Sequence, residues 1–236
     1  GCPTPYYIAD ELSFNDVVLG TPEDFIKRGV NVKTLHKVTD IDFKNKTLNI
    51  EGNDINGIFE YDKLVIAVGA KSFVPNIDGY SENLENVFTL SHAEHAIKIK
   101  EYINNNKDKL KKAVVVGAGF IGLETAEAFN IKNLEVTVVE KADRIFPTVS
   151  ENLKSEIYED IEKHGLTLKL NSGVNKIILE NNIAKSVQLD NGENLDFDIA
   201  LFSIGITPNI EFISSELKTE NGKIIVNDKF ETNIPD

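Results

Sequence analysis

The sequence predicts an α/β fold built around a parallel sheet. Short apolar runs alternate with helical stretches, the order that produces parallel strands joined by crossover helices. The apolar run at residues 113–116 leads into a loop with glycine at three positions, and a helical stretch follows. The next apolar strand ends on an acid, Glu140. Together these observations predict a Rossmann-like domain.

The first third of the chain is expected to combine one helix with several strands. Thr21 and Pro22 are typical as the N-cap and first residue of a helix, and Gly29 is typical of a helix end. An apolar run at residues 64–68, stopped by Gly69, predicts a strand buried on both faces. Period-two alternation predicts further strands at residues 30–32, 37–41 and 47–50.

The rest of the chain continues the alternation. An amphipathic helix is expected at residues 91–104, with Ser91 as its cap and Glu94 completing a capping box. Asn181 and Asn182 predict a hairpin turn. The other expected helices span residues 122–130 and 150–164, and the other expected strands span residues 113–116, 135–140, 166–170, 174–179, 183–189, 199–203 and 223–226.

The composition excludes several classes of protein. The 236 residues include 25 Lys and Arg against 38 Asp and Glu, a net charge of -13, so we expect no nucleic-acid partner. No apolar run is long enough to span a bilayer, so we expect no membrane partner. One cysteine, Cys2, cannot form an intrachain disulfide, and no signal peptide is recognisable, which favours a cytoplasmic protein. Methionine is absent even at position 1, so we expect a chain that is processed, altered or cut from a longer one.

The glycine loop, residues 117–122, predicts a dinucleotide site. Gly117 would make the tight turn, Gly119 would let the backbone approach the pyrophosphate, and Gly122 would let the helix pack closely on the strand. The pyrophosphate would then rest on the positive end of the helix dipole.

Glu140 predicts which dinucleotide is bound. Its carboxylate would bond the ribose 2′-hydroxyl and repel a 2′-phosphate, so NADH is favoured over NADPH, although Lys141 and Arg144 nearby soften that preference. The alternative is a glycine-rich turn that has lost its ligand, with Glu140 merely solvated.

Seven motifs in order give the chain a family resemblance. They are residues 2–8 (CPTPYYI), 21–25 (TPEDF), 61–64 (YDKL) with 67–70 (AVGA), 117–124 (GAGFIGLE), 136–144 (VTVVEKADR), 204–209 (IGITPN) and 226–233 (VNDKFETN). In these residues the chain resembles the pyridine nucleotide-disulfide oxidoreductases. It looks most like the single-cysteine branch of coenzyme A-disulfide reductases, NADH oxidases, NADH peroxidases and sulfur reductases.

The resemblance implies a domain organisation. Residues 1–110 would be part of an FAD-binding domain of the GR2 type, residues 111–205 a complete NAD(P)H-binding domain, and residues 206–236 a truncated return segment of the FAD domain. The family's N-terminal glycine motif for FAD and its C-terminal dimerisation domain have no counterpart in this chain. The complete protein would be a homodimer.

The resemblance also implies a redox role for Cys2. In this branch one cysteine faces the flavin and cycles as a sulfenate, a mixed disulfide with coenzyme A or a persulfide. A single cysteine is compatible with this chemistry, because any disulfide it forms must involve an external thiol. The alternative is an incidental cysteine near the end of the chain.

Further cofactor contacts follow from the resemblance alone. Val38 matches a flavin contact, and Ala67, Val68 and Gly69 match an Ala-Thr-Gly flavin stretch in which Val68 replaces the threonine. The family commonly has an arginine near the flavin where this chain has Ser91.

Four residues match family contacts to the flavin or to NAD. Phe120 matches an aromatic gate over the flavin, and Glu124 an acid near the flavin–nicotinamide junction. Ile121 and Gly205 match NAD contacts. The alternatives are a packed aromatic for Phe120 and a surface acid for Glu124.

The implied activity is that of an FAD-dependent NADH oxidoreductase. Hydride would pass by way of the flavin to Cys2, and then to a small-molecule acceptor: a disulfide such as coenzyme A disulfide, a peroxide, sulfur or oxygen. The alternatives are an isolated NADH-binding module without catalytic activity and a scaffold that binds neither cofactor. We expect no metal, since His92 and His95 lack an acid or cysteine cluster to complete a site.

Overall fold

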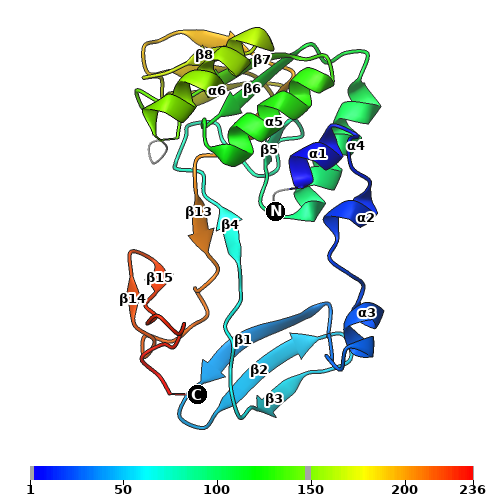
Figure 1. The fold of residues 1–236 in the computed structure, drawn as a ribbon, viewed down its shortest axis with the longest axis vertical. Coiled ribbons are helices and arrows are strands. Elements are labelled where there is room, and N and C mark those ends of the chain that lie inside the picture. Colours follow the sequence, from blue (N-terminus) through cyan, green and yellow to red (C-terminus); the bar gives the residue numbers. More distant parts are fainter. Residues whose placement is uncertain (1–2, 147–149, 236) are drawn as a thin grey trace. The chain divides into compact units, whose positions relative to one another are not determined.

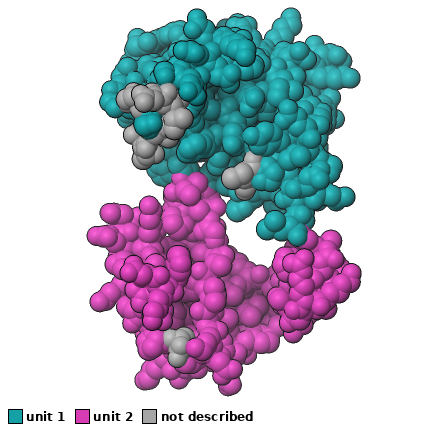
Figure 2. Space-filling model, viewed as in Figure 1, with its two compact units in different colours: residues 1–19, 72–205 teal, residues 20–71, 206–236 magenta. Residues whose placement is uncertain are grey.

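The computed structural model describes residues 3–146 and 150–235 (Figure 1). The chain forms two compact units, coloured separately in Figure 2. Unit 1 comprises residues 1–19 and 72–205, and unit 2 comprises residues 20–71 and 206–236. Because the chain passes from one unit to the other three times, each unit is built from segments far apart in the sequence.

A five-stranded parallel sheet forms the centre of unit 1. Its order is β5 (Val87–Thr89), β12 (Ile199–Phe202), β6 (Lys112–Val116), β7 (Glu135–Val139) and β8 (Thr167–Lys169). Every neighbouring pair is parallel. The α/β fold class is therefore confirmed, with β6 in the middle of the sheet, as in Rossmann-type sheets.

Different elements cover the two faces of this sheet. Ala113 and Val115 of β6 face a core shared with helices α1 (Thr4–Ile8), α4 (Ala93–Asn106), α5 (Phe120–Ile131) and α6 (Glu151–Lys163). Val114 and Val116 face the antiparallel sheet of β9 (Val174–Glu180), β10 (Ile183–Leu189) and β11 (Asn194–Asp196). Alternate residues of one strand thus enter two separate cores, which explains its unbroken apolar run.

Unit 2 holds an antiparallel sheet and short elements. The sheet is β1 (His36–Asp42), β2 (Thr47–Gly52) and β3 (Gly57–Glu60). Among its described residues, the buried apolar side chains are those of Ile41 and Leu217. Its core is therefore thin.

The remaining elements of the chain are α2 (Phe14–Val17), α3 (Pro22–Lys27), β14 (Thr219–Glu220), β15 (Lys223–Ile224), and β4 (Ala70–Ser72), which pairs with β13 (Ile206–Pro208).

Several local predictions are confirmed. Helix α3 begins at Pro22 after Thr21, whose side chain forms a capping box with Asp24. Gly29 follows its end with a φ of +81°. The hairpin between β9 and β10 turns at Asn181 and Asn182, both in the left-handed region, as hairpin turns of this type require.

Three local predictions are wrong. Residues 64–68 form no strand, and Val65 is 85% exposed, because burial on both faces needs neighbours that the described part of unit 2 does not supply. Residues 30–32 also form no strand. Helix α4 has His92 rather than Ser91 as its N-cap, and the Ser91 hydroxyl instead lies 3.4 Å from Nδ1 of His95.

The compact units do not divide at residue 110. Residues 72–110 lie in unit 1 because β5 pairs with β12 and α4 packs in the core of that unit. Residues 1–19 belong to unit 1 as well. The assignment of segments to FAD and NAD(P)H domains stays a prediction.

Among the described residues, no helix has both the length and the apolar character needed to span a bilayer.

Candidate dinucleotide-binding site

The glycine loop lies at the carboxyl ends of the central strands. It joins β6 to α5, and β6 lies between β7 and β12 in the sheet. After β6 the chain continues to β7 and β8 on one side of this strand, whereas β12 lies on its other side. The order of the strands in the sheet therefore reverses at β6. Ligands of open α/β sheets bind at such a switch point.

The three glycines of this loop have different structural requirements. Gly117 has a φ of +105°, and a Cβ there would lie 2.2 Å from the Ser203 carbonyl oxygen. A Cβ on Gly122 would lie 2.0 Å from the carbonyl oxygen of Gly117, so helix and loop approach too closely for a side chain. A Cβ on Gly119 would have no atom within 4 Å. Gly117 and Gly122 therefore serve the fold, whereas Gly119 leaves its backbone open to a ligand.

We expect Gly119→Ala to weaken NADH binding without unfolding the chain. Gly119 is the N-cap of α5 with an extended backbone, which alanine adopts freely, so the free energy of unfolding should change by less than about 1 kcal/mol. The added methyl group would hold the pyrophosphate away from the backbone, raising the Kd for NADH about tenfold or more, the equivalent of one lost hydrogen bond to a charged group. Calorimetric titration with NADH measures the affinity, and an unchanged Kd would contradict this role.

Glu140 holds the glycine loop in place. Its Oε2 accepts a hydrogen bond from the Ala118 backbone N–H at 2.8 Å, and its Oε1 accepts one from the Ala142 N–H at 2.8 Å. A carboxylate has about four acceptor sites, so both bonds leave capacity for a ribose hydroxyl. The sequence predicted the ribose contact, but the clamp between the two loops appears only in the structure.

A cavity of about 480 Å³ opens in front of this loop. This volume lies in the usual range for small-molecule sites. Glu140 and Lys141 line it, whereas the guanidinium of Arg144 is held by Asp143 at 2.7 and 2.9 Å. The other lining residues are Phe73, Pro75, Ile77, Val116, Gly117, Ala118, Gly119, Val139, Phe146, Ser172, Gly173, Val174, Asn175, Asp190, Ser203 and Ile204.

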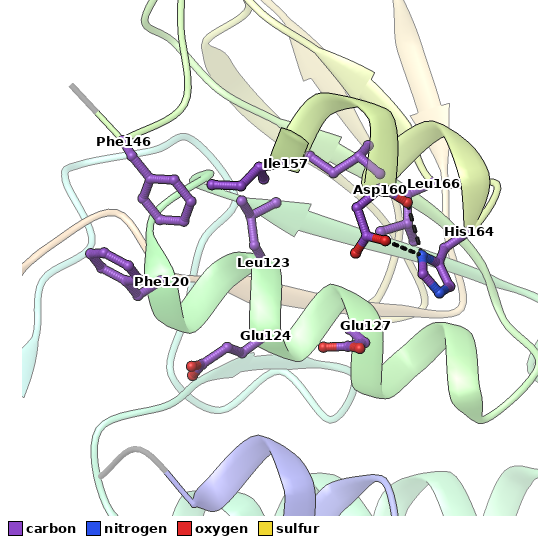
Figure 3. A pocket seen from close by; sticks show the side chains of 10 residues that line it. Phe120, Leu123, Glu124, Glu127, Phe146, Ile157, Asp160, His164 and Leu166 are labelled. Atoms are coloured by element: carbon purple, nitrogen blue, oxygen red, sulfur yellow. Dashed lines mark hydrogen bonds and ion pairs between the residues drawn. The ribbon is translucent and has the colours of Figure 1, made fainter. Parts of the chain in front are cut away.

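Phe120 lies beside a second cavity, between α5 and α6, of about 280 Å³ (Figure 3). Its ring is 64% exposed and stacks on Phe146, with the ring centroids 4.3 Å apart. Phe146 is buried, lines both cavities and has a φ of +41°, which is rare for a bulky residue. The role of Phe146 could not be predicted from the sequence, since no glycine or asparagine signals its left-handed backbone.

Glu124 and Glu127 line the second cavity from α5. Burial raises the pKa of the Glu124 carboxyl above its usual range, and the neighbouring Glu127 charge raises it further. Glu124 therefore keeps a proton more readily than an exposed acid does. Ile121, on the same helix, is 37% exposed. Gly205, with a φ of +145°, lies against the Phe73 ring.

The residues predicted to contact flavin lie in unit 2. Val38 is in β1, and Ala67, Val68 and Gly69 lie in the stretch before β4. Gly69 has a φ of +65°, and a Cβ there would have no atom within 4 Å. The backbone at Gly69 therefore has room for a ligand, and its contact with flavin stays a prediction.

Asn209 fixes the backbone of the same stretch. Its side chain donates to the Val68 carbonyl, and its backbone N–H donates to the Gly69 carbonyl, both at 3.1 Å.

The structure thus brings together one group of the predicted residues. Unit 1 places the glycine loop, Phe120 and Glu140 around one end of the sheet, whereas Cys2 lies outside the described residues. Within the described ranges, no group of three or more His, Cys, Asp or Glu side chains could hold a metal ion. His92 and His95 have ring centroids 5.7 Å apart.

Known proteins resemble this chain over its whole length. Residues 1–236 match the family described as pyridine nucleotide-disulphide oxidoreductase. An NADH oxidase of Methanocaldococcus jannaschii is 36% identical over 99% of this chain and 52% of its own. A coenzyme A disulfide reductase of Staphylococcus aureus is 32% identical over 99% of this chain and 52% of its own. The chain spans about half the length of these curated relatives.

Solved structures show the same fold. A crystal structure described as reduced Bacillus anthracis CoADR-RHD matches with a TM-score of 0.87 and 30% identity, covering 99% of this chain and 42% of that one. An NAD-dependent persulfide reductase from A. fulgidus matches with a TM-score of 0.86 and 33% identity, covering 98% of this chain and 43% of that one. The family match and the relatives agree along the whole chain, and the glycine loop held by Glu140 is consistent with them. The protein therefore belongs to the pyridine nucleotide-disulphide oxidoreductase family.

Proposed function

We propose that the chain is the NADH-binding and cysteine-bearing part of an FAD-dependent NADH oxidoreductase. The observation that carries the proposal is the glycine loop, with Gly119 open to the cavity and Glu140 at its side. The relatives named NADH oxidase and coenzyme A disulfide reductase support the same class of reaction.

The chain's own residues would bind and orient NADH. The backbone at Gly119 and the N-terminus of α5 would hold the pyrophosphate, since free N–H groups at a helix start favour anions. Glu140 would accept a hydrogen bond from the adenosine ribose. Phe120, exposed within the glycine loop, would flank the path of the nicotinamide.

FAD would be held in part by backbone groups at Val38, Ala67, Val68 and Gly69. When bound, FAD supplies the two-electron relay between NADH and a thiol. The open backbone at Gly69 supports this assignment, because a flavin can approach a glycine without meeting a side chain.

Cys2 would be the chain's redox thiol. Its thiolate would attack an external disulfide RSSR, forming a mixed disulfide and releasing RS⁻, which takes a proton from solution to become the first RSH. Two electrons and one proton, both from NADH, would then reduce the mixed disulfide, releasing the second RSH and restoring the Cys2 thiolate. The balanced reaction consumes one NADH, one proton and one RSSR, and yields NAD⁺ and two RSH. Coenzyme A disulfide is the acceptor we place first, with a peroxide, sulfur or oxygen as the alternatives.

Cys2→Ser is expected to uncouple the two halves of this reaction. In the flavin-containing protein, NADH should still bleach the flavin absorbance, because serine leaves the dinucleotide site intact. NADH oxidation with coenzyme A disulfide should fall on the order of 10³-fold or more, the usual effect of losing a nucleophile. Stopped-flow absorbance measures the first step and steady-state NADH oxidation the second. Undiminished turnover with every acceptor class would refute the role of Cys2.

A second candidate function is an NADH-binding module without catalysis. The thin core of unit 2, in contrast to the well-packed core of unit 1, favours it. Absorbance and calorimetry discriminate between the two. A purified chain that lacks flavin absorbance but binds NADH is such a module, whereas bound flavin that NADH reduces supports the enzyme. A chain that binds neither cofactor would refute both candidates.

A further inference from the structure

The loop that follows β7 contacts the glycine loop at two points, one on each side of Gly119. Glu140, the first residue after β7, accepts a hydrogen bond from the Ala118 N–H. Phe146, further along the same loop, stacks on the ring of Phe120, with the ring planes inclined by 32°. Figure 3 shows these two rings side by side, with Phe120 at the start of α5. The residues before and after the open backbone of Gly119 are therefore both contacted by one loop.

Phe146 is fixed in a backbone conformation that phenylalanine rarely adopts. Its φ of +41° lies in the left-handed region, and such strain persists only where the surrounding structure holds the residue. The preceding residue supplies this anchor, because Ile145 is fully buried and its N–H donates to the Tyr158 hydroxyl of α6 at 3.2 Å. Strained positions of this kind are concentrated at binding and active sites, which makes Phe146 a candidate for a role in the dinucleotide site.

Phe120, in contrast, has a largely exposed side chain. A ring this exposed can turn between staggered rotamers, and Gly119 beside it lines the dinucleotide cavity. In the structure the Phe120 ring lines the second cavity, between α5 and α6, and it is not among the side chains that line the dinucleotide cavity. The stack on Phe146 is the aromatic contact that the structure shows for this ring. A fixed residue thus contacts one that is free to turn.

We propose that Phe146 is a positioning residue, which holds the Phe120 ring on the α6 side of the glycine loop, clear of the cavity where NADH would bind. The proposal rests on the NADH site of the proposed function. Phe146 lines both cavities, so its side chain can contact Phe120 in one and a bound dinucleotide in the other. A Phe120 ring released from this stack would compete with NADH for the space in front of Gly119.

The sequence contains no tryptophan, so the surroundings of the ring at position 120 can be measured by fluorescence. Phe120→Trp would give the chain a single tryptophan, at a position exposed enough to accept the larger ring. In this background we expect Phe146→Leu to raise the rate constant for acrylamide quenching about twofold, because leucine is apolar but cannot stack on the indole. Phe146→Tyr keeps an aromatic ring, and its added hydroxyl has room at the cavities, so quenching should stay as in Phe120→Trp alone.

A double-mutant cycle separates positioning from the direct contribution of Phe146 to the cavity wall. In the otherwise unchanged chain, Phe146→Leu should raise the Kd for NADH about two- to tenfold, the range expected for the loss of one aromatic pair. In a Phe120→Ala background the same substitution should change the Kd by less than about twofold, because no ring is left to position. Phe88→Leu, which breaks the aromatic pair with Tyr102 in the same unit, is the matched control and should leave both the Kd and the quenching unchanged.

Two results would overturn the proposal. If Phe146→Leu changed the Kd equally in both backgrounds, Phe146 would act as a cavity wall alone. If the quenching did not respond to Phe146→Leu, the ring at position 120 would not depend on Phe146. Should Phe146→Leu fail to fold, Phe146→Met keeps a long apolar side chain and gives the same two readouts. Failure of the proposed function shows separately, as a wild-type chain that does not bind NADH, and the tryptophan quenching then still tests the contact with Phe146.

Discussion

Gly117→Ala is expected to abolish NADH binding and destabilise unit 1. Two costs combine at this position: a φ of +105°, which alanine rarely adopts, and a Cβ only 2.2 Å from the Ser203 carbonyl oxygen. The strain alone is worth about 1–3 kcal/mol, and relieving the clash must move β12 or the glycine loop. We expect the free energy of unfolding, measured in urea, to fall by about 3 kcal/mol or more.

Two other glycines separate the causes of this effect. Gly165→Ala introduces the same kind of backbone strain, with a φ of +70°, but its Cβ would have no atom within 4 Å, so its cost should be about 1 kcal/mol. Gly119→Ala has no strain and should affect NADH binding alone. If Gly117→Ala kept the stability and the NADH affinity of the wild type, the loop would accommodate a side chain at this position, and the prediction would be wrong.

Glu140→Ala is expected to have the second largest effect. The substitution removes the acceptor of the Ala118 and Ala142 N–H groups and the predicted partner of the ribose. Losing a charged hydrogen bond costs about 1.5–3 kcal/mol, so the Kd for NADH should rise roughly 10- to 150-fold. NADPH should lose less, because the repulsion of its 2′-phosphate is also removed. Calorimetry with both dinucleotides measures the difference between the affinities for NADH and NADPH.

The same strand offers a matched control. Glu135 is exposed at the opposite end of β7, so Glu135→Ala removes an equal charge far from the glycine loop and should leave NADH affinity unchanged. Glu140→Gln should lie between wild type and Glu140→Ala, since an amide keeps one acceptor oxygen. If Glu140→Ala binds NADH as tightly as wild type, the site assigned to the glycine loop is wrong.

The parts of the fold that local sequence determines could be predicted. The glycine loop stands between a strand and a helix as expected, because turn, strand and helix signals lie within about 30 residues of one another. The capped start of α3 and the asparagine turn between β9 and β10 are equally local. In each case neighbouring residues alone restrict the backbone.

Features that depend on distant residues could not be predicted. The apolar run at residues 64–68 is only half-buried, because burial is decided by neighbours from elsewhere in the chain. Asp10 forms ion pairs with Lys100 and Lys132, which lie 90 and 122 positions further along the chain, and no periodicity reveals them. The hydrogen bonds to Glu140 depend on how closely two loops approach in space, which the sequence does not show. Phe146 has a left-handed backbone, and a phenylalanine gives no sign of that conformation.

Strand β12 imposes an order on the folding of unit 1. It is the last strand of the sheet to be synthesised, yet it lies between β5 and β6. A nascent chain therefore cannot extend this sheet one strand at a time. Until β12 leaves the ribosome, β5 has no partner in the sheet and β6 has an open edge, both of which attract other unfolded chains. The sheet closes last at β12, so the chain is most exposed to aggregation after the glycine loop has been synthesised but before the Ser203 carbonyl, against which Gly117 packs, is in place.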